Sequence, residues 1–474
     1  MLFNSIEFVF FFIIVTGLYF LLPHKYRWFL LLAASCYFYM AFVPVYLLIL
    51  AFTIVVDYFA GIYIENSSGH KRKLLLIASL VANIGVLAVF KYYNFINDNI
   101  THILGNFGIP NNIPYLQILL PIGLSFHTFQ AMSYTIEVYR GNQPAERHFG
   151  IYSLYVMFYP QLVAGPIERP QNLLHQFYTK HRFDYNNVVS GLRLMLWGFV
   201  KKLFIADRLA IYVNAVYGNP EEHTGITLIV ATVFFAFQIY CDFSGYSEIA
   251  IGSARVMGFD LMKNFNRPYL AQNISEFWKK WHISLSTWFK DYLYISLGGN
   301  RVSLPRVYLN LFIVFLISGL WHGANWTYVI WGGLNGIYLI TAMMRRKYID
   351  QYIGKIIPVN NRFIKVVNIL ITFILICFSW IFFRAESLDD AMLIISRVFT
   401  FSGPLFYYNP LMAYCVMAIA FLLISEILLE RHGAIIWKTY NSNRFLRYSS
   451  YVVLVLIILL FGVFDGGQFI YFQF

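Results

Sequence analysis

The stretch that decides the fold runs from Val307 to Met344 and reads VYLNLFIVFLISGLWHGANWTYVIWGGLNGIYLITAMM. Its 38 residues contain no Lys, Arg, Asp or Glu, and they contain one histidine, His322. An uncharged apolar stretch of this length is typical of membrane-spanning helices, and an ionisable side chain inside one is costly to bury. The sequence therefore predicts a membrane protein with a functional site at His322. A core histidine that bonds a neighbouring helix is the alternative.

The residues around His322 define the geometry that we expect. At about 1.5 Å per residue, a helix over Val307–Leu320 is about 21 Å long and ends inside a bilayer core about 30 Å thick. Irregular backbone at that depth lines a cavity or is buried in protein, so we expect His322 at the tip of a short helix, on the floor of a funnel. Trp321, Asn325 and Trp326 offer side-chain donors beside the imidazole. The glycines here, which let backbones approach closely or break a helix, are Gly319, Gly323, Gly332, Gly333 and Gly336.

The composition agrees with a membrane protein. The chain is 59% hydrophobic and 12% charged, whereas soluble domains carry about 25% charged residues. The net charge of +12 arises from Lys and Arg in short loops, and no basic stripe with stacking aromatics lies outside the apolar helices, which excludes nucleic-acid binding. The four cysteines lie in apolar runs without a CxxC pair and are expected to be small core residues.

The apolar spans predict an all-α polytopic protein. We expect about 11 transmembrane helices, plus re-entrant or interfacial helices, around a central funnel or tunnel in a single domain over residues 1–474. The clear spans are Phe8–Leu22, Trp28–Phe42, Tyr46–Ile62, Leu74–Phe90, Leu309–Leu320, Trp326–Met344, Phe363–Phe383, Pro410–Leu429 and Tyr448–Phe464. The first span lacks a basic region before it and a cleavage site after it, so it is expected to be a membrane helix rather than a signal peptide. The basic loops at 25–27, 71–73, 345–347 and 431–444 indicate the cytoplasmic side, and both termini are then extracytoplasmic.

A second group of candidate site residues lies at Asn273–Leu297, which reads NISEFWKKWHISLSTWFKDYLYISL. Asn273 and Glu276 have the spacing of a helix-capping box. An apolar stripe with His282 follows at helical spacing and predicts an amphipathic helix at the cytoplasmic interface; its members are Trp278, His282, Leu285 and Phe289. Lys279, Lys280 and Lys290 lie away from that stripe. A plain interfacial anchor is the alternative for this segment.

Motifs typical of other enzyme classes and of zinc sites are missing from the sequence. There is no GxxxxGK[ST] motif and no GxSxG motif, which argues against a P-loop ATPase and an α/β-hydrolase. Zinc-binding spacings such as HExxH are also missing, so we expect no metal. The basic loop from Gly298 to Arg306 is either a contact for phosphate groups of a cofactor or an ordinary positive-inside loop.

Several long motifs give the chain a family resemblance. They are Met1–Pro23, Leu120–Gly141, Gln161–Arg169, Gly198–Leu209, Tyr240–Gly258, Phe277–Arg301 and Ser318–Trp326 (SGLWHGANW). In these motifs the chain resembles the membrane-bound O-acyltransferases, and specifically the branch of the alginate O-acetyltransferase membrane subunit. The resemblance implies that His322 is the principal catalytic histidine and that His282 is the second active-site position. It also implies a many-helix fold with both histidines near a tunnel that links the cytoplasmic and outer faces.

The resemblance implies a transferase of the bacterial inner membrane that moves an acetyl group from cytoplasmic acetyl-CoA toward an extracytoplasmic acceptor. An esterase-like partner outside the membrane would complete transfer to alginate, cellulose, peptidoglycan or a similar polysaccharide. A neutral His322 is the expected base, and His282 is expected to position the thioester. The other candidates along the tunnel are Trp278, Trp281, Trp321, Asn325, Trp326 and Asp291, of which Asn325 or a tryptophan N–H would steady the oxyanion. The candidates for phosphate contacts are Lys279, Lys280 and Arg301.

Two alternatives stay open at this point. A sister group moves D-alanine to teichoic acid from a carrier protein. A transporter or flippase of glycans would also contain broken helices and buried polar groups.

Overall fold

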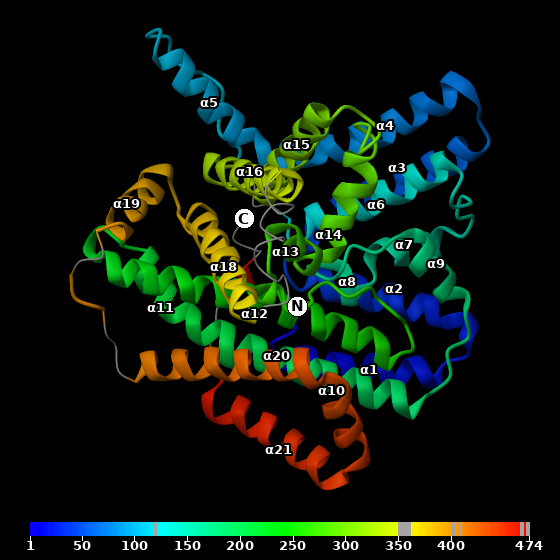
Figure 1. Ribbon diagram of the computed structural model, residues 1–474. Helices are drawn as coiled ribbons and strands as arrows, with labels where there is room; N and C mark the ends of the chain where they lie inside the picture. Colours follow the sequence, from blue (N-terminus) through cyan, green and yellow to red (C-terminus); the bar gives the residue numbers. More distant parts are fainter. Residues whose placement is uncertain (118–120, 349–361, 401–402, 407–409, 465–468, 471–474) are drawn as a thin grey trace. The chain divides into compact units, whose positions relative to one another are not determined.

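The computed structural model describes residues 1–474 except 118–120, 349–361, 401–402, 407–409, 465–468 and 471–474 (Figure 1). The described residues form helices and connecting loops, without a strand. Each apolar span predicted from the sequence lies on a helix, with ends within a few residues except at Pro410–Leu429, whose helix continues to Ser442. The predicted class, an all-α polytopic membrane protein, is therefore confirmed.

Seven helical segments within the described ranges are long and apolar enough to cross a membrane, judged by length and composition. They are Pro44–Glu65, Gly69–Gly105, Gly225–Val256, Leu304–His322, Arg362–Arg384, Leu411–Ile436 and Arg444–Phe461. The predicted count of about 11 crossings is not reached by these seven segments and stays a prediction.

The chain divides into two compact units, and the prediction of one domain remains a prediction. The first unit comprises residues 1–195 and 247–262. Its helices are α1 (Ile6–Leu21), α2 (His24–Met40), η1 (Pro44–Tyr46), α3 (Leu47–Glu65), α4 (Gly69–Leu87), η2 (Ala88–Tyr92), α5 (Tyr93–Gly105), α6 (Leu124–Arg140), α7 (Phe149–Met157), α8 (Tyr159–Leu162), α9 (Pro170–Tyr178) and most of α10 (Tyr185–Phe199). A buried polar cluster joins α3 to α4, where Asp57 accepts hydrogen bonds from Ser79 Oγ at 2.6 Å and Asn83 Nδ2 at 2.8 Å.

The second unit comprises residues 196–246 and 263–473 and contains every predicted site residue. Its helices are η3 (Val200–Ala206), α11 (Asp207–Tyr217), η4 (Pro220–Glu222), η5 (Pro268–Leu270), α13 (Ile274–Lys280), α14 (Ile283–Trp288), η6 (Phe289–Tyr294), α15 (Leu304–His322), α16 (Trp326–Tyr348), α18 (Arg362–Arg384), α19 (Leu388–Val398), α20 (Leu411–Ser442) and α21 (Arg444–Phe461). The long helix α12 (Gly225–Val256) contributes residues to both units.

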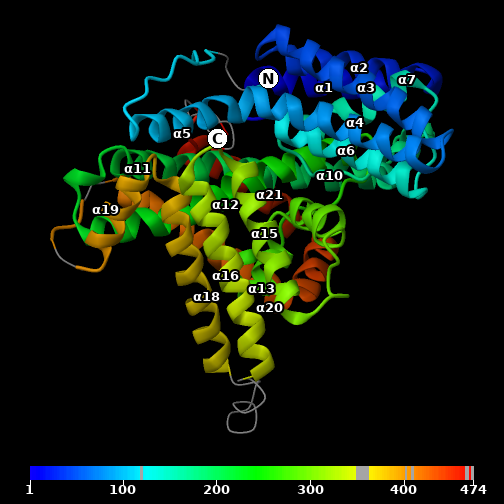
Figure 2. The same ribbon diagram turned by 90° about the horizontal axis from the view of Figure 1, so that it is seen from above.

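Helices α15, α16 and α18 run side by side in the second unit (Figure 2). A Cβ atom on Gly319 would lie 2.2 Å from the carbonyl oxygen of Tyr328, and one on Gly332 would lie 2.3 Å from that of Phe315. Only a residue without a side chain allows so close an approach of two helix backbones. The predicted role of these two glycines in close packing is thus confirmed.

The predicted short helix before His322 is partly wrong. Helix α15 ends at His322, where Gly323 is extended, as expected. It begins at Leu304, however, because Pro305 in its first turn is compatible with a helix start. Its 19 residues correspond to about 28 Å, which is close to the full thickness of a bilayer core.

The predicted continuous amphipathic helix over Asn273–Leu297 is also wrong. Asn273 caps α13, as its side chain accepts a hydrogen bond from the Glu276 backbone N–H at 2.9 Å. The helix then ends at Lys280, and the chain restarts in α14 at Ile283. The break is at His282, whose φ of 42° and ψ of 57° are left-handed. This backbone conformation cannot continue a right-handed helix.

Candidate active site

His322 lies at the C-terminal end of α15 within an aromatic wall. It is 5% exposed. Its ring centroid is 4.9 Å from that of Trp321, 5.0 Å from that of Trp331 on α16 and 5.3 Å from that of Phe383 on α18. Three neighbouring helices therefore fix the position of this imidazole.

His282 lies in the break between α13 and α14 and is 1% exposed. Phe243 packs edge-on against its ring at a centroid distance of 4.6 Å. Trp321 contacts this ring as well, at 6.3 Å, so one indole touches both histidines. Burial lowers the pKa of His282 to about 3, because the apolar surroundings disfavour the imidazolium cation. The imidazole is therefore neutral at physiological pH.

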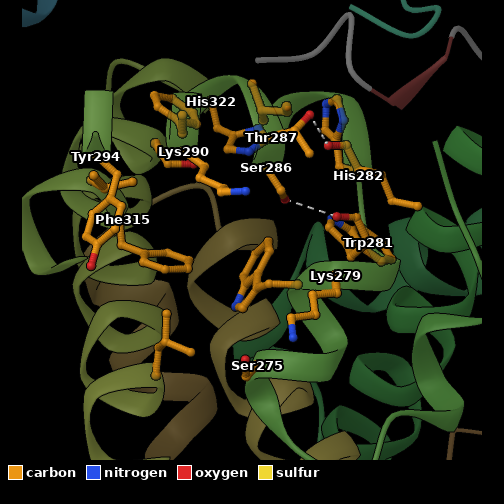
Figure 3. Close-up of a pocket in the computed structure, with 17 residues that line it drawn as sticks. Ser275, Lys279, Trp281, His282, Ser286, Thr287, Lys290, Tyr294, Phe315 and His322 are labelled. Carbon is orange, nitrogen blue, oxygen red and sulfur yellow. Dashed lines mark hydrogen bonds between the residues drawn. The ribbon is translucent and has the colours of Figure 1, made fainter. Parts of the chain in front are cut away.

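A cavity of about 390 Å³ brings the two histidines onto one wall (Figure 3). His282, His322, Trp278, Trp281 and Lys279 all line it, as do Ser286, Thr287 and Lys290. Most of its surface is apolar, and the polar groups are few, which is typical of ligand sites. The cavity has room for a small molecule or a thin chain beside the two imidazoles.

Comparisons with known proteins identify the family of this chain. The profile of the membrane-bound O-acyltransferase family matches residues 148–383, which include both histidines. The probable alginate O-acetylase AlgI of Pseudomonas aeruginosa is 42% identical over 407 residues, which are 85% of this chain and 75% of that protein. The chain belongs to the membrane-bound O-acyltransferase family. The O-acyltransferase is thus an enzyme and a multi-pass membrane protein, and the transporter alternative is set aside.

Two further relatives show the range of acceptors in this group. The peptidoglycan O-acetyltransferase of Helicobacter pylori is 35% identical over a match of 440 residues, which covers 85% of this chain and 80% of that protein. The teichoic acid D-alanyltransferase of Bacillus subtilis is 26% identical over 298 residues, covering 58% of this chain and 71% of that protein. The O-acyltransferase is thus more similar to these O-acetylating relatives than to this D-alanyltransferase.

Some predicted site residues of the O-acyltransferase lie away from the cavity. Asn325 caps α16 by accepting from the Thr327 N–H at 3.0 Å, and its amide donates to the Glu386 carbonyl at 3.3 Å. Lys280 pairs with Glu276 at 2.8 Å. Four others do not line the cavity either: the exposed Trp326 and Arg301, the half-buried Asp291, and the buried Trp321, whose ring packs on both histidines.

Other residues of the site escaped the sequence prediction. Lys290 was expected to lie away from the apolar stripe, yet it lines the cavity, and its amine points into it (Figure 3). The break at His282 changes the direction of the helix and so changes the face on which Lys290 lies. Asn264 contacts His282 from 18 residues upstream, Phe383 contacts His322 from α18, and Trp331 contacts His322 from the following helix α16. No local pattern marks these three residues.

No group of His, Cys, Asp and Glu in the described part of the chain has the arrangement of a metal site.

Proposed function

We propose that the O-acyltransferase moves an acetyl group from cytoplasmic acetyl-CoA toward an extracytoplasmic acceptor, for O-acetylation of a cell-envelope or secreted polysaccharide. The observation that carries this proposal is the apolar cavity with His282 and His322 on its wall. The relatives support an acetyl group, because the names of the more similar ones describe O-acetylation, whereas D-alanyl transfer occurs in a relative with 26% identity.

A second cavity supports a CoA thioester as donor. It has a volume of about 710 Å³ and lies among residues of α13, α16 and α18. Ser275 and Lys279 line both cavities, and in Figure 3 they lie away from the two histidines. Lys279, Arg345 and Arg346 make the second cavity cationic, which favours the phosphates of a nucleotide. A thin pantetheine arm would then pass Ser275 and carry the acetyl group to the histidines.

This arrangement replaces two of the predicted phosphate contacts. Arg301 lines neither cavity, and Lys280 pairs with Glu276. Arg345 and Arg346, which the sequence indicated only as a cytoplasmic loop, take their place beside Lys279. The proposal thus puts the second cavity on the cytoplasmic side, in line with the basic loop at 345–347.

The two imidazoles provide the proton transfer that acyl transfer needs. An acceptor hydroxyl oxygen attacks the thioester carbonyl carbon and gives its proton to a neutral histidine, for which we propose His322. The carbon–sulfur bond then breaks, and the thiolate of CoA takes up that proton as it leaves. The products are an acetyl ester and CoA–SH. Lys290, with its amine in the cavity, is our candidate for stabilising the oxyanion in place of Asn325.

The last part of the proposal concerns the molecule that accepts the acetyl group outside the membrane. We propose that the acceptor hydroxyl belongs to an extracytoplasmic esterase-like partner, which passes the acetyl group to alginate, peptidoglycan, cellulose or a similar glycan. The protein would lie in the bacterial inner membrane with both termini outside.

The test is the acetyl-ester content of envelope and secreted glycans, measured as base-released acetate. Cells carry wild type, His322→Ala, His282→Ala or the control His102→Ala, which changes an exposed histidine on α5. We expect each site variant to lose at least about 100-fold in acetylation at an unchanged protein level in the membrane, and the control to match wild type. Wild-type acetylation in His322→Ala would refute the assignment.

A further inference from the structure

The backbone of His282 is held in an unfavourable conformation. Among the described residues, His282 and Arg267 are the non-glycine residues with positive φ, and the value for His282 is 42°. Such a conformation persists only where surrounding contacts fix it, and it is common at functional sites. The contacts that fix His282 therefore point to the groups that define its chemistry.

Asn264 provides these contacts from a loop 18 residues upstream. Its backbone carbonyl accepts a hydrogen bond from the Ile283 N–H at 2.8 Å. Its side-chain oxygen accepts from the Ser284 backbone N–H at 3.2 Å and from the Ser284 hydroxyl at 2.9 Å. The same oxygen lies 3.2 Å from Nδ1 of His282. Both side chains are 1% exposed, so water does not compete for these bonds.

These bonds determine which nitrogen of His282 carries the proton. A backbone N–H can only donate, so the Asn264 atom that faces Ser284 is the oxygen and not the amide nitrogen. The Ser284 hydroxyl also lies 3.5 Å from Nδ1, but it donates its single hydrogen to the Asn264 oxygen, which is closer at 2.9 Å. An oxygen without a hydrogen can only accept, so Nδ1 of His282 is the donor to Asn264. A neutral imidazole has a single N–H, and Nε2 is therefore its acceptor nitrogen.

We propose that Asn264 is a positioning residue that holds His282 in the Nδ1–H tautomer, so that His282 enters acyl transfer as a hydrogen-bond acceptor through Nε2. His282 then accepts a hydrogen bond at Nε2 beside the base His322, and it cannot donate a hydrogen bond to the thioester carbonyl from that nitrogen. This inference rests on the proposed function of the cavity. It revises the expectation that His282 positions the thioester.

Asn264 also acts as a long-range cap of α14, and a purely capping role is the competing explanation. Replacement of Asn264 by aspartate distinguishes the capping role from the positioning role, because Asp caps a helix as well as Asn does. The carboxylate introduced by Asn264→Asp would add a negative charge beside Nδ1 and favour the imidazolium form of His282. The other titratable groups on the cavity wall are Lys279, Lys290, Tyr294 and His322, and the rings packed on His282 are the neutral Phe243, Phe265 and Trp321.

The experiment measures transfer of base-labile label from radiolabelled acetyl-CoA in inverted membrane vesicles that contain the full-length protein and its native acceptor. Rates of wild type, Asn264→Asp, Asn264→Ser and the control Asn335→Asp are compared between about pH 5 and pH 8.5. Asn335 is also a buried asparagine of this unit, and its amide bonds the carbonyl of Trp331 in its own helix. Rates are normalised to the protein present in the vesicles.

We expect Asn264→Asp to shift the acid limb of the pH profile upward by about one pH unit or more, because His282 protonates more easily. Asn264→Ser keeps a capping oxygen on a shorter side chain and should lower kcat at least about tenfold with KM for acetyl-CoA unchanged. The Asn335 control should keep the wild-type pH profile.

Three results would overturn the inference or its basis. A wild-type pH profile in Asn264→Asp, together with wild-type kcat in Asn264→Ser, leaves only the capping role. Higher activity of Asn264→Asp at acid pH means that His282 acts as a donor. If instead His282→Ala keeps the wild-type rate of transfer, the proposed site itself fails and the inference falls with it. The first result, found together with an inactive His282→Ala, overturns the inference and leaves the proposed site standing.

Discussion

Two adjacent glycines on α16 offer a test of how α15 and α16 position His322. A Cβ atom on Gly332 would lie 2.3 Å from the carbonyl oxygen of Phe315 on α15. A Cβ atom on the neighbouring Gly333 would lie 3.6 Å from Leu316 Cδ2, which is an ordinary contact. Gly332→Ala and Gly333→Ala are thus the same chemical change on the same helix, and only the first one forces α15 and α16 apart.

The structure gives the size of the losses in stability and rate that we expect for Gly332→Ala. The contact at Gly332 must open by about 1 Å before it becomes an ordinary van der Waals contact. Overpacking of this kind costs about 1–3 kcal/mol, whereas alanine in place of glycine in a helix gains about 1 kcal/mol. The same movement shifts His322, at the end of α15, relative to Trp331 on α16, and a misplacement of about 1 Å costs about 100-fold in rate.

The assay pairs melting temperature in detergent with acetyl transfer in vesicles. We expect Gly333→Ala to melt at or above the wild-type temperature and to keep full activity. Gly332→Ala should melt below Gly333→Ala and lose about 100-fold in kcat. Equal melting temperatures and equal rates for the two variants would refute the view that backbone contact between α15 and α16 positions His322.

Two more predictions follow from the cavities. Lys279→Gln and Arg346→Gln should each raise KM for acetyl-CoA about tenfold with kcat unchanged, since each removes a charge-assisted phosphate contact. The control Arg301→Gln should match wild type in initial-rate kinetics over acetyl-CoA concentration. An effect of Arg301→Gln as large as the other two would contradict the placement of the nucleotide. Lys290→Gln should lower kcat by about 10- to 100-fold and leave KM unchanged, because its amine is expected to act on the developing oxyanion; an unchanged kcat would exclude that role.

The sequence alone determined the features that depend on local composition and spacing. The uncharged run at Val307–Met344 predicted a membrane protein, and the end of α15 at His322 was expected from the glycines after it. The capping pair Asn273 and Glu276 placed the start of α13 correctly. Hydrophobicity and capping act over a few residues, so they can be read along the chain without knowledge of the fold.

The tertiary structure decided what the histidines touch. His282 leaves the helical path because Asn264, far upstream, binds the two N–H groups that follow it. That break brings Lys290 to the cavity. Arg345 and Arg346 join Lys279 only because α16 packs beside α13. These contacts join segments that are distant in sequence, and helical periodicity carries no information on which distant backbone group will satisfy a buried donor.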